Sequence, residues 1–131
     1  MKLSILRQFF ALLVLLVVVN TVSAAPVYRI RFARGAVSAT VGGTLYGQHS
    51  KRHYILRVRA GQRMKVHVTS IQLTNPQIDV IFPNGEHMDR DMQGTQFETD
   101  STQAGDYRIV VYEGLKGDPG RGKFKLWVEV I

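Results

Sequence analysis

The chain has 131 residues, with 17 Lys and Arg against 10 Asp and Glu, a formal net charge of +7 and no cysteine. This length fits one domain with one core. The lack of cysteine excludes a disulfide-stapled scaffold, a cysteine nucleophile and attachment as a lipoprotein.

The first 24 residues predict a secretory signal peptide. Lys2 and Arg7 precede an apolar run from Phe9 to Val19, and Val22-Ser23-Ala24 resembles a signal peptidase site. The run is shorter than the roughly 20 residues of a spanning helix, although an uncleaved anchor is the alternative. We expect cleavage after Ala24, export to the periplasm of a Gram-negative bacterium, and a single domain over residues 25–131 that makes no membrane contact.

The remaining elements read as strands, taken in chain order. Residues 28–32 alternate apolar and basic side chains, which predicts the first strand. Residues 37–45 predict the second strand, and Gly42-Gly43 within it suggests a bulge, or a bend between two sheets. Residues 53–70 alternate on both sides of Ala60-Gly61-Gln62, which predicts a β-hairpin with a basic outer face.

The second half of the chain continues the pattern. Residues 78–82 predict an interior strand, 96–99 a short strand, 107–112 a central strand and 124–131 an alternating final strand. Residues 86–94 are polar and aperiodic, and no window predicts an amphipathic helix after the signal. The prediction is an all-β fold, an antiparallel β-sandwich of about eight strands and of jelly-roll-like type.

No catalytic or metal site can be assembled from the sequence motifs. Paired carboxylates could come from Asp89 and Asp91 or from Asp100 and Asp106, but Asp89 and Asp91 sit in a polar loop with no apolar pocket that would raise one pKa, and we expect no enzyme. The four histidines give at most two convergent zinc ligands, and we read them as solvated. The 84–91 loop has oxygens that calcium could use but lacks EF-hand spacing, so we expect no metal and no cofactor.

Two features are candidates for binding. Basic side chains alternate out of the predicted strands at Arg29, Arg31, Arg57, Arg59, Arg63 and Lys65. They would form one positive surface only if they share a face, and a solvated sheet face is the alternative. We exclude nucleic acid for an exported chain without an aromatic platform. The glycine-rich loop 113–122 is the better candidate, with Glu113, Lys116, Asp118 and Arg121 as charged probes, or else it is a flexible excursion.

Four segments carry a resemblance to a known family. RIRFARGAVSATVGGTLYG, YILRVRAGQRMKVHV, QAGDYRIVVY and KFKLWVEVI occur in this order across the mature chain. Together they resemble the periplasmic inhibitors of g-type lysozyme, and more loosely the bacterial pre-peptidase C-terminal domains, which are also small sandwiches.

The resemblance implies a sandwich that blocks the cleft of a lysozyme with its loops. In that family, arginines before the last strand meet acidic groups of the enzyme; Lys116 and Arg121 are the nearest equivalents here, and an aromatic of an earlier loop falls on Gln48. The implied partner is therefore a lysozyme of the g type. The implied contacts are Gln48, His49, Arg52, Lys116, Asp118 and Arg121. The alternative is a non-catalytic carbohydrate- or cell-surface-binding module of the pre-peptidase type. The sequence does not decide the oligomeric state.

Overall fold

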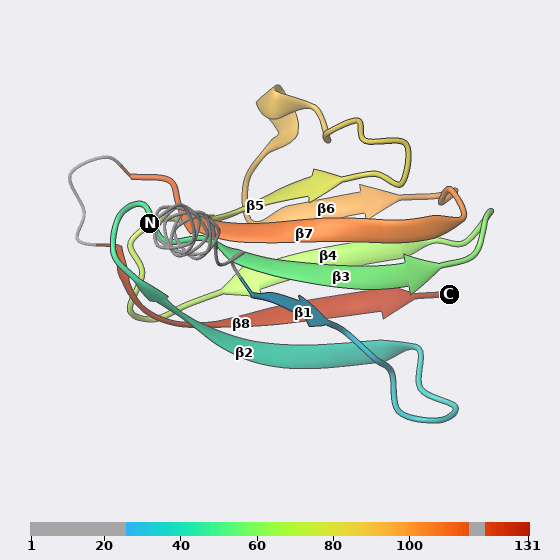
Figure 1. Cartoon of the computed structure of the whole chain (residues 1–131), viewed down its shortest axis with the longest axis horizontal. Coiled ribbons are helices and arrows are strands. Elements are labelled where there is room, and N and C mark those ends of the chain that lie inside the picture. The colour runs from blue at the N-terminus through green and yellow to red at the C-terminus, as the bar shows by residue number, and fades with distance from the viewer. Residues whose placement is uncertain (1–25, 116–119) are drawn as a thin grey trace, which may run out of the picture.

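The computed structural model describes residues 26–115 and 120–131, and Figure 1 shows them as two packed β-sheets. The first sheet has the order β1-β3-β7-β5 and the second the order β2-β8-β4-β6. Every strand pair is antiparallel except β1 with β3, which is parallel. The prediction of an eight-stranded β-sandwich is therefore confirmed. The strands are β1 (Val27–Arg29), β2 (Ser38–Tyr46), β3 (Arg52–Val58), β4 (Met64–Thr69), β5 (Pro76–Ile81), β6 (Gln96–Thr99), β7 (Gly105–Glu113) and β8 (Arg121–Val130).

The signal peptide lies outside the described residues. In the part of the chain that the structure describes, no helix is long and apolar enough to cross a membrane. Its one helical element is a 3-10 turn, η1 (Arg90–Met92), in the loop after β5.

The predicted hairpin over residues 53–70 is wrong, although both of its strands exist. β3 pairs with β1 and β7, whereas β4 pairs with β6 and β8, so the two strands belong to opposite sheets. Gly61, with φ of 77°, turns the chain as expected, but the turn carries it across the core and not to a neighbouring strand. Alternation reports which face of a strand is buried, and that face is the same in a hairpin and in this crossover.

The glycine pair of β2 makes neither a bulge nor a bend between sheets. β2 pairs with β8 in unbroken register from Ser38 opposite Glu129 to Tyr46 opposite Arg121. Position 43 is a glycine because packing leaves no room for a side chain there. A Cβ placed on it would lie 2.3 Å from Phe124 Cζ and 2.5 Å from Tyr54 Oη, so two aromatic side chains occupy the space of its missing side chain.

The core lies between the sheets and follows the alternation in the sequence. In β8, Phe124, Leu126, Val128 and Val130 are buried while the residues between them face outward, as predicted. β7 is central to its sheet, also as predicted.

β5 is an edge strand and not the interior strand that its apolar sequence predicts. The loop that follows it folds back along the free edge. The amides of Ile78 and Met88 donate to the carbonyl oxygens of Gly94 and Val80, both at 2.8 Å. The loop thus satisfies part of the free edge. Ile78 and Val80 are fully buried because they face the core between the sheets, and an apolar strand of this kind reads as an interior one in the sequence.

Candidate protein-binding surface at one end of the sandwich

Three connections between the sheets gather at one end of the sandwich, on the left of Figure 1. They are the segments 47–51 between β2 and β3, 70–75 between β4 and β5, and 114–120 between β7 and β8, of which 116–119 are not described. We call this region the loop end. Each segment joins a strand of one sheet to a strand of the other, so the loop end closes the core on this side.

Glu113 fastens two of these segments to each other. Its carboxylate accepts hydrogen bonds from the amides of Asn75, at 2.9 Å, and Leu115, at 3.0 Å, while the amide of Gly114 donates to the carbonyl of Asn75. Only 6% of Glu113 is exposed. The prediction that Glu113 is a charged probe is therefore wrong: it ends β7 and uses its charge to hold backbone amides.

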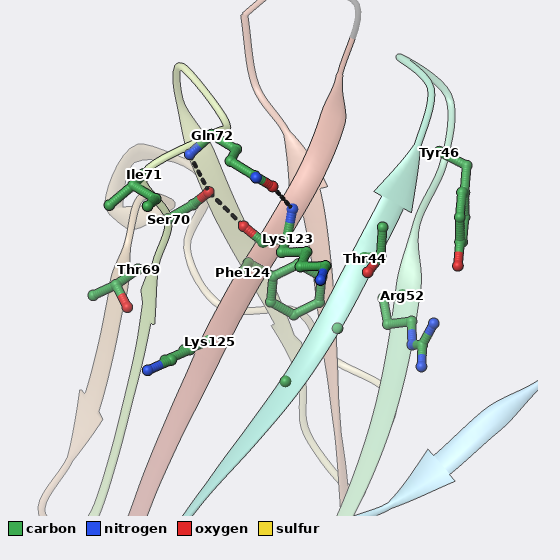
Figure 2. A pocket seen from close by; sticks show the side chains of 12 residues that line it. Thr44, Tyr46, Arg52, Thr69, Ser70, Ile71, Gln72, Lys123, Phe124 and Lys125 are labelled. Carbon is green, nitrogen blue, oxygen red and sulfur yellow. Dashed lines mark hydrogen bonds between the residues drawn. The ribbon is translucent and has the colours of Figure 1, made fainter.

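Segment 70–75 is fastened to β8 in a second place, which Figure 2 shows. The Ser70 hydroxyl donates to the carbonyl of Lys123 at 2.7 Å, and the amide of Lys123 donates to Gln72 Oε1 at 2.6 Å. The Ser70 oxygen also accepts from the amides of Gln72 and Leu73. A short turn is thus fixed by its own side chains, and Leu73 is buried beneath it.

Segment 47–51 packs directly on Gly120, the last residue of segment 114–120. A Cβ on Gly120 would lie 2.7 Å from Gln48 Cα, and Gly120 has a φ of 63°. Glycine meets both conditions, a close approach of two backbones and a left-handed conformation. All three segments therefore contact one another or β8, which makes the described part of the loop end a continuous surface.

Large apolar side chains are exposed on this surface. Tyr46, the last residue of β2, is 72% exposed, Ile71 of segment 70–75 is fully exposed, and Leu115 of segment 114–120 is 45% exposed. Tyr46 and Ile71 border a pocket of about 720 Å³ that also involves Gly42, Thr44, Lys123 and Lys125. Figure 2 shows Tyr46 and Ile71 on opposite sides of this pocket. Exposed aromatic and aliphatic residues beside cations are typical of a protein-binding surface.

The structure places the residues predicted as partner contacts in three different ways. Gln48 and His49 are exposed in segment 47–51, and Arg121 is exposed at the start of β8, opposite Tyr46. These three lie together at the loop end. Lys116 and Asp118 lie outside the described residues.

Arg52 is not a free loop residue. It begins β3 half-buried, with its guanidinium carbon 3.9 Å from the centre of the Tyr28 ring, a cation–π contact. Its Nε is buried without a hydrogen-bond partner, as is the hydroxyl of Tyr54. Burial raises the pKa of Tyr54, and the charge of Arg52 offsets part of that rise.

Tyr46 and Ile71 were not predicted as contacts from the sequence. The one available signal is an apolar side chain at or just beyond the end of a strand, at a position where no core-facing alternation accounts for it. In the alternation of β2, Leu45 faces the core and Tyr46 faces outward, and Ile71 follows the polar Thr69-Ser70.

The predicted basic residues do not form one surface. Arg29 and Arg57 lie in the first sheet, whereas Lys65 lies in the second, so their outward faces point in opposite directions. Three of the six have acidic partners, in the pairs Arg29–Asp106, Arg63–Asp100 and Lys65–Glu98.

Side chains of the 84–91 loop also make local hydrogen bonds. Asn84 Oδ1 accepts from the amide of Glu86, and Asp89 Oδ1 from the amide of Asp91. Among the described residues, no three His, Asp or Glu side chains come together as metal ligands. His87 is exposed at the surface as predicted, with 55% of its side chain accessible, and its Nδ1 also lies 2.7 Å from Asp79 Oδ2.

Comparison with solved structures identifies similar folds. A periplasmic inhibitor of g-type lysozyme, PliG of Aeromonas hydrophila, superposes with a TM-score of 0.65 at 24% identity, covering 80% of this chain and 96% of that one. PliG of Salmonella Typhimurium gives 0.61 at 15% identity, covering 82% and 100%. The pre-peptidase C-terminal domain of a Bacillus anthracis collagenase gives 0.61 at 16% identity, covering 83% and 100%. No protein-family model and no curated protein matches the sequence.

These likenesses confirm the resemblance at the level of the fold. The chain is similar in structure to the lysozyme inhibitors and to a pre-peptidase domain. Because the second inhibitor and the pre-peptidase domain have the same TM-score, the fold does not discriminate between the two functions.

Proposed function

We propose that this chain is an exported, non-catalytic inhibitor of lysozyme, of the g type, which blocks the enzyme's cleft with its loop end. The observation that carries the proposal is the loop end itself: three segments locked to one another, with apolar side chains exposed on the result. The fold it shares with the PliG proteins supports the same reading.

The loop end has the chemistry that an acidic cleft would accept. A glycosidase cleft presents carboxylates, and a guanidinium can bind a carboxylate through two parallel hydrogen bonds. Arg121 is exposed at this end and has no ion pair with any described residue. Tyr46 stands opposite Arg121 in the register of β2 and β8, so an aromatic anchor and a cation lie side by side.

Rigidity favours inhibition over loose association. The hydrogen bonds of Glu113, Ser70 and Gln72 hold the described loop-end backbone before any partner arrives. A preordered surface loses less conformational entropy on binding, so more of the contact energy appears as affinity.

The test is lysis of a peptidoglycan suspension by g-, c- and i-type lysozymes, with and without the mature protein. We expect stoichiometric inhibition of the g-type enzyme alone. Tyr46→Ala and Arg121→Ala should each weaken inhibition about tenfold or more, which corresponds to roughly 1.4 kcal/mol.

Matched controls come from the opposite end of the sandwich. Arg34 and Val37 are exposed there, between β1 and β2, so Arg34→Ala and Val37→Ala should inhibit like the unmodified protein. Failure to inhibit any of the three enzymes would refute the proposal.

A second candidate function is a non-catalytic carbohydrate- or cell-surface-binding module, which the pre-peptidase likeness favours. Binding to insoluble glycans without any lysozyme inhibition would support it. A melting temperature that rises with calcium would do so too, because a ligand bound only to the folded state stabilises that state.

A further inference from the structure

A second concave region lies on the outer face of the first sheet, away from the core. Its floor is a row of three residues in register, His53 of β3, Val110 of β7 and Asp79 of β5. The loop after β5 forms a wall through His87, Arg90 and Gln93, and the open groove has a volume of about 460 Å³. We call this region the sheet groove. Its volume falls within the range of small-molecule sites, about 300–1,000 Å³.

Val110 gives the sheet groove an apolar floor. It is only 6% exposed, yet it is not part of the core cluster between the sheets, because it points to the opposite face from its neighbours Ile109 and Val111. Ile81 lines the groove beside it. An outward-facing valine this well covered requires walls on both sides, which the neighbouring strands and the loop provide.

The polar groups of the sheet groove are held in fixed orientations by one another. The Tyr112 hydroxyl donates to Gln93 Oε1 at 3.0 Å, and Gln93 Nε2 donates to Asp79 Oδ1 at 3.3 Å. His87 Nδ1 lies 2.7 Å from Asp79 Oδ2. Four residues distant in the sequence thus form a chain of hydrogen bonds around a carboxylate that is only 18% exposed. Such a chain sets donors and acceptors in place before a ligand binds.

Two cations border this network without an acidic partner. Lys51 and Arg90 line the groove, and neither makes an ion pair with a described residue. The one carboxylate in the lining, Asp79, is already engaged by His87 and Gln93. Asp89 and Asp91 flank Arg90 in the sequence but do not line the groove. The rim therefore presents positive charge.

We propose that the sheet groove binds an acidic sugar, with the sugar's carboxylate between Lys51 and Arg90. The ring hydroxyls would bond to the Asp79–Gln93–Tyr112 network, because each hydroxyl needs both a donor and an acceptor. The carbon face of the ring would lie on Val110. A plain inorganic anion would leave the apolar floor uncovered.

The test is a titration of the 15N-labelled mature protein followed by amide NMR. The probes are D-glucuronate, with its carboxylate on the ring, N-acetylmuramate, with its carboxylate on an ether arm, D-glucose, which is neutral, and acetate and inorganic phosphate. At least one acidic sugar should produce saturable shifts confined to the groove residues, at least tenfold tighter than glucose or acetate. The sugar that binds more tightly identifies the source of the ligand.

Two surface variants and one control sharpen the test. Lys51→Gln and Arg90→Gln should each weaken the acidic sugar about tenfold, whereas Arg34→Gln, an exposed arginine at the other end of the sandwich, should leave binding unchanged. Phosphate or acetate binding as tightly as the sugars would overturn the proposal, and so would the absence of saturable groove shifts. No lysozyme is present, so this result is independent of the inhibition assay.

Discussion

Gly43→Ala gives the sharpest test of how the core is packed beneath β2. The new methyl group would lie 2.3 Å from Phe124 Cζ and 2.5 Å from Tyr54 Oη. Both side chains are buried, at 3% and 2% exposure, and their rings meet edge to face with centroids 6.3 Å apart. The methyl group therefore cannot fit unless two core rings move together.

The expected loss of stability follows from two opposing effects. Overpacking a core costs about 1–3 kcal/mol. Replacing glycine by alanine restricts the unfolded chain and returns about 0.4–1 kcal/mol. The net destabilisation is roughly 1–2 kcal/mol, which lowers the melting temperature by about 4–16 °C in a domain of this size.

Gly42→Ala is the matched control, one residue away on the opposite face of the same strand. The nearest atom to its added Cβ is the Phe124 carbonyl oxygen at 4.0 Å, an ordinary contact. We expect an unchanged or slightly higher melting temperature. Thermal and urea unfolding followed by circular dichroism measure both variants, and equal effects would refute the packing argument. Phe124→Leu should cost less in the Gly43→Ala background than alone, because the smaller side chain relieves the contact.

Three further predictions concern single groups. Thr102→Val should destabilise the protein by about 1–3 kcal/mol in urea unfolding, because this buried hydroxyl is hydrogen-bonded on both sides of the chain reversal between β3 and β4. The hydrogen bonds and charge of Arg29 hold the pKa of Asp106 below its usual value, so Arg29→Gln should raise the pKa of Asp106 in a carboxyl NMR titration. The stabilisation that Asp106 gives the folded state is present above the unfolded-state pKa near 3.8 and is lost as the pH falls through the lower folded-state pKa. Burial, and then the charges of Arg108 and Lys51, lower the pKa of His53 below 6.5. The stability of the folded protein should therefore rise with pH between the folded-state pKa of His53 and 6.5. Arg108→Gln should raise the pKa of His53 in an imidazole titration.

The sequence predicts the strands of this fold well because each carries its own signal. β8 alternates over its whole buried length, and β3 and β4 do so on both sides of Gly61. A strand's buried face is a local property, decided by which side chains leave water. Which strands pair with one another is not a local property. Whether Gly61 turns the chain to a neighbour or across the core depends on the path of the backbone, and the alternation is identical in both cases.

The same limit applies to the candidate sites. Arg121 was singled out because it lies in a glycine-rich segment, whereas Gln48 and His49 were implied by the resemblance to the lysozyme inhibitors; as partner contacts all three stay predictions. Glu113 was misread because its charge, taken alone, suggests exposure. Its role depends on two amides, of Asn75 and Leu115, that only the folded chain brings to it. The sheet groove joins β3, β5, β7 and a loop, so no single stretch of sequence carries its signal.

The crossover between β3 and β4 also decides where this basic protein can receive an acidic partner. In a hairpin, Arg57 and Lys65 would lie on one face and add their charges. In the structure they lie on opposite sheets, and Lys65 pairs with Glu98 while Arg57 neighbours the Arg29–Asp106 pair. The cations left without an ion pair to a described residue include Arg121 and Lys123 at the loop end, and Lys51 and Arg90 at the sheet groove. Because exposed, compensated charges contribute little attraction, the paired cations Arg29, Arg63 and Lys65 should add little to binding at either place.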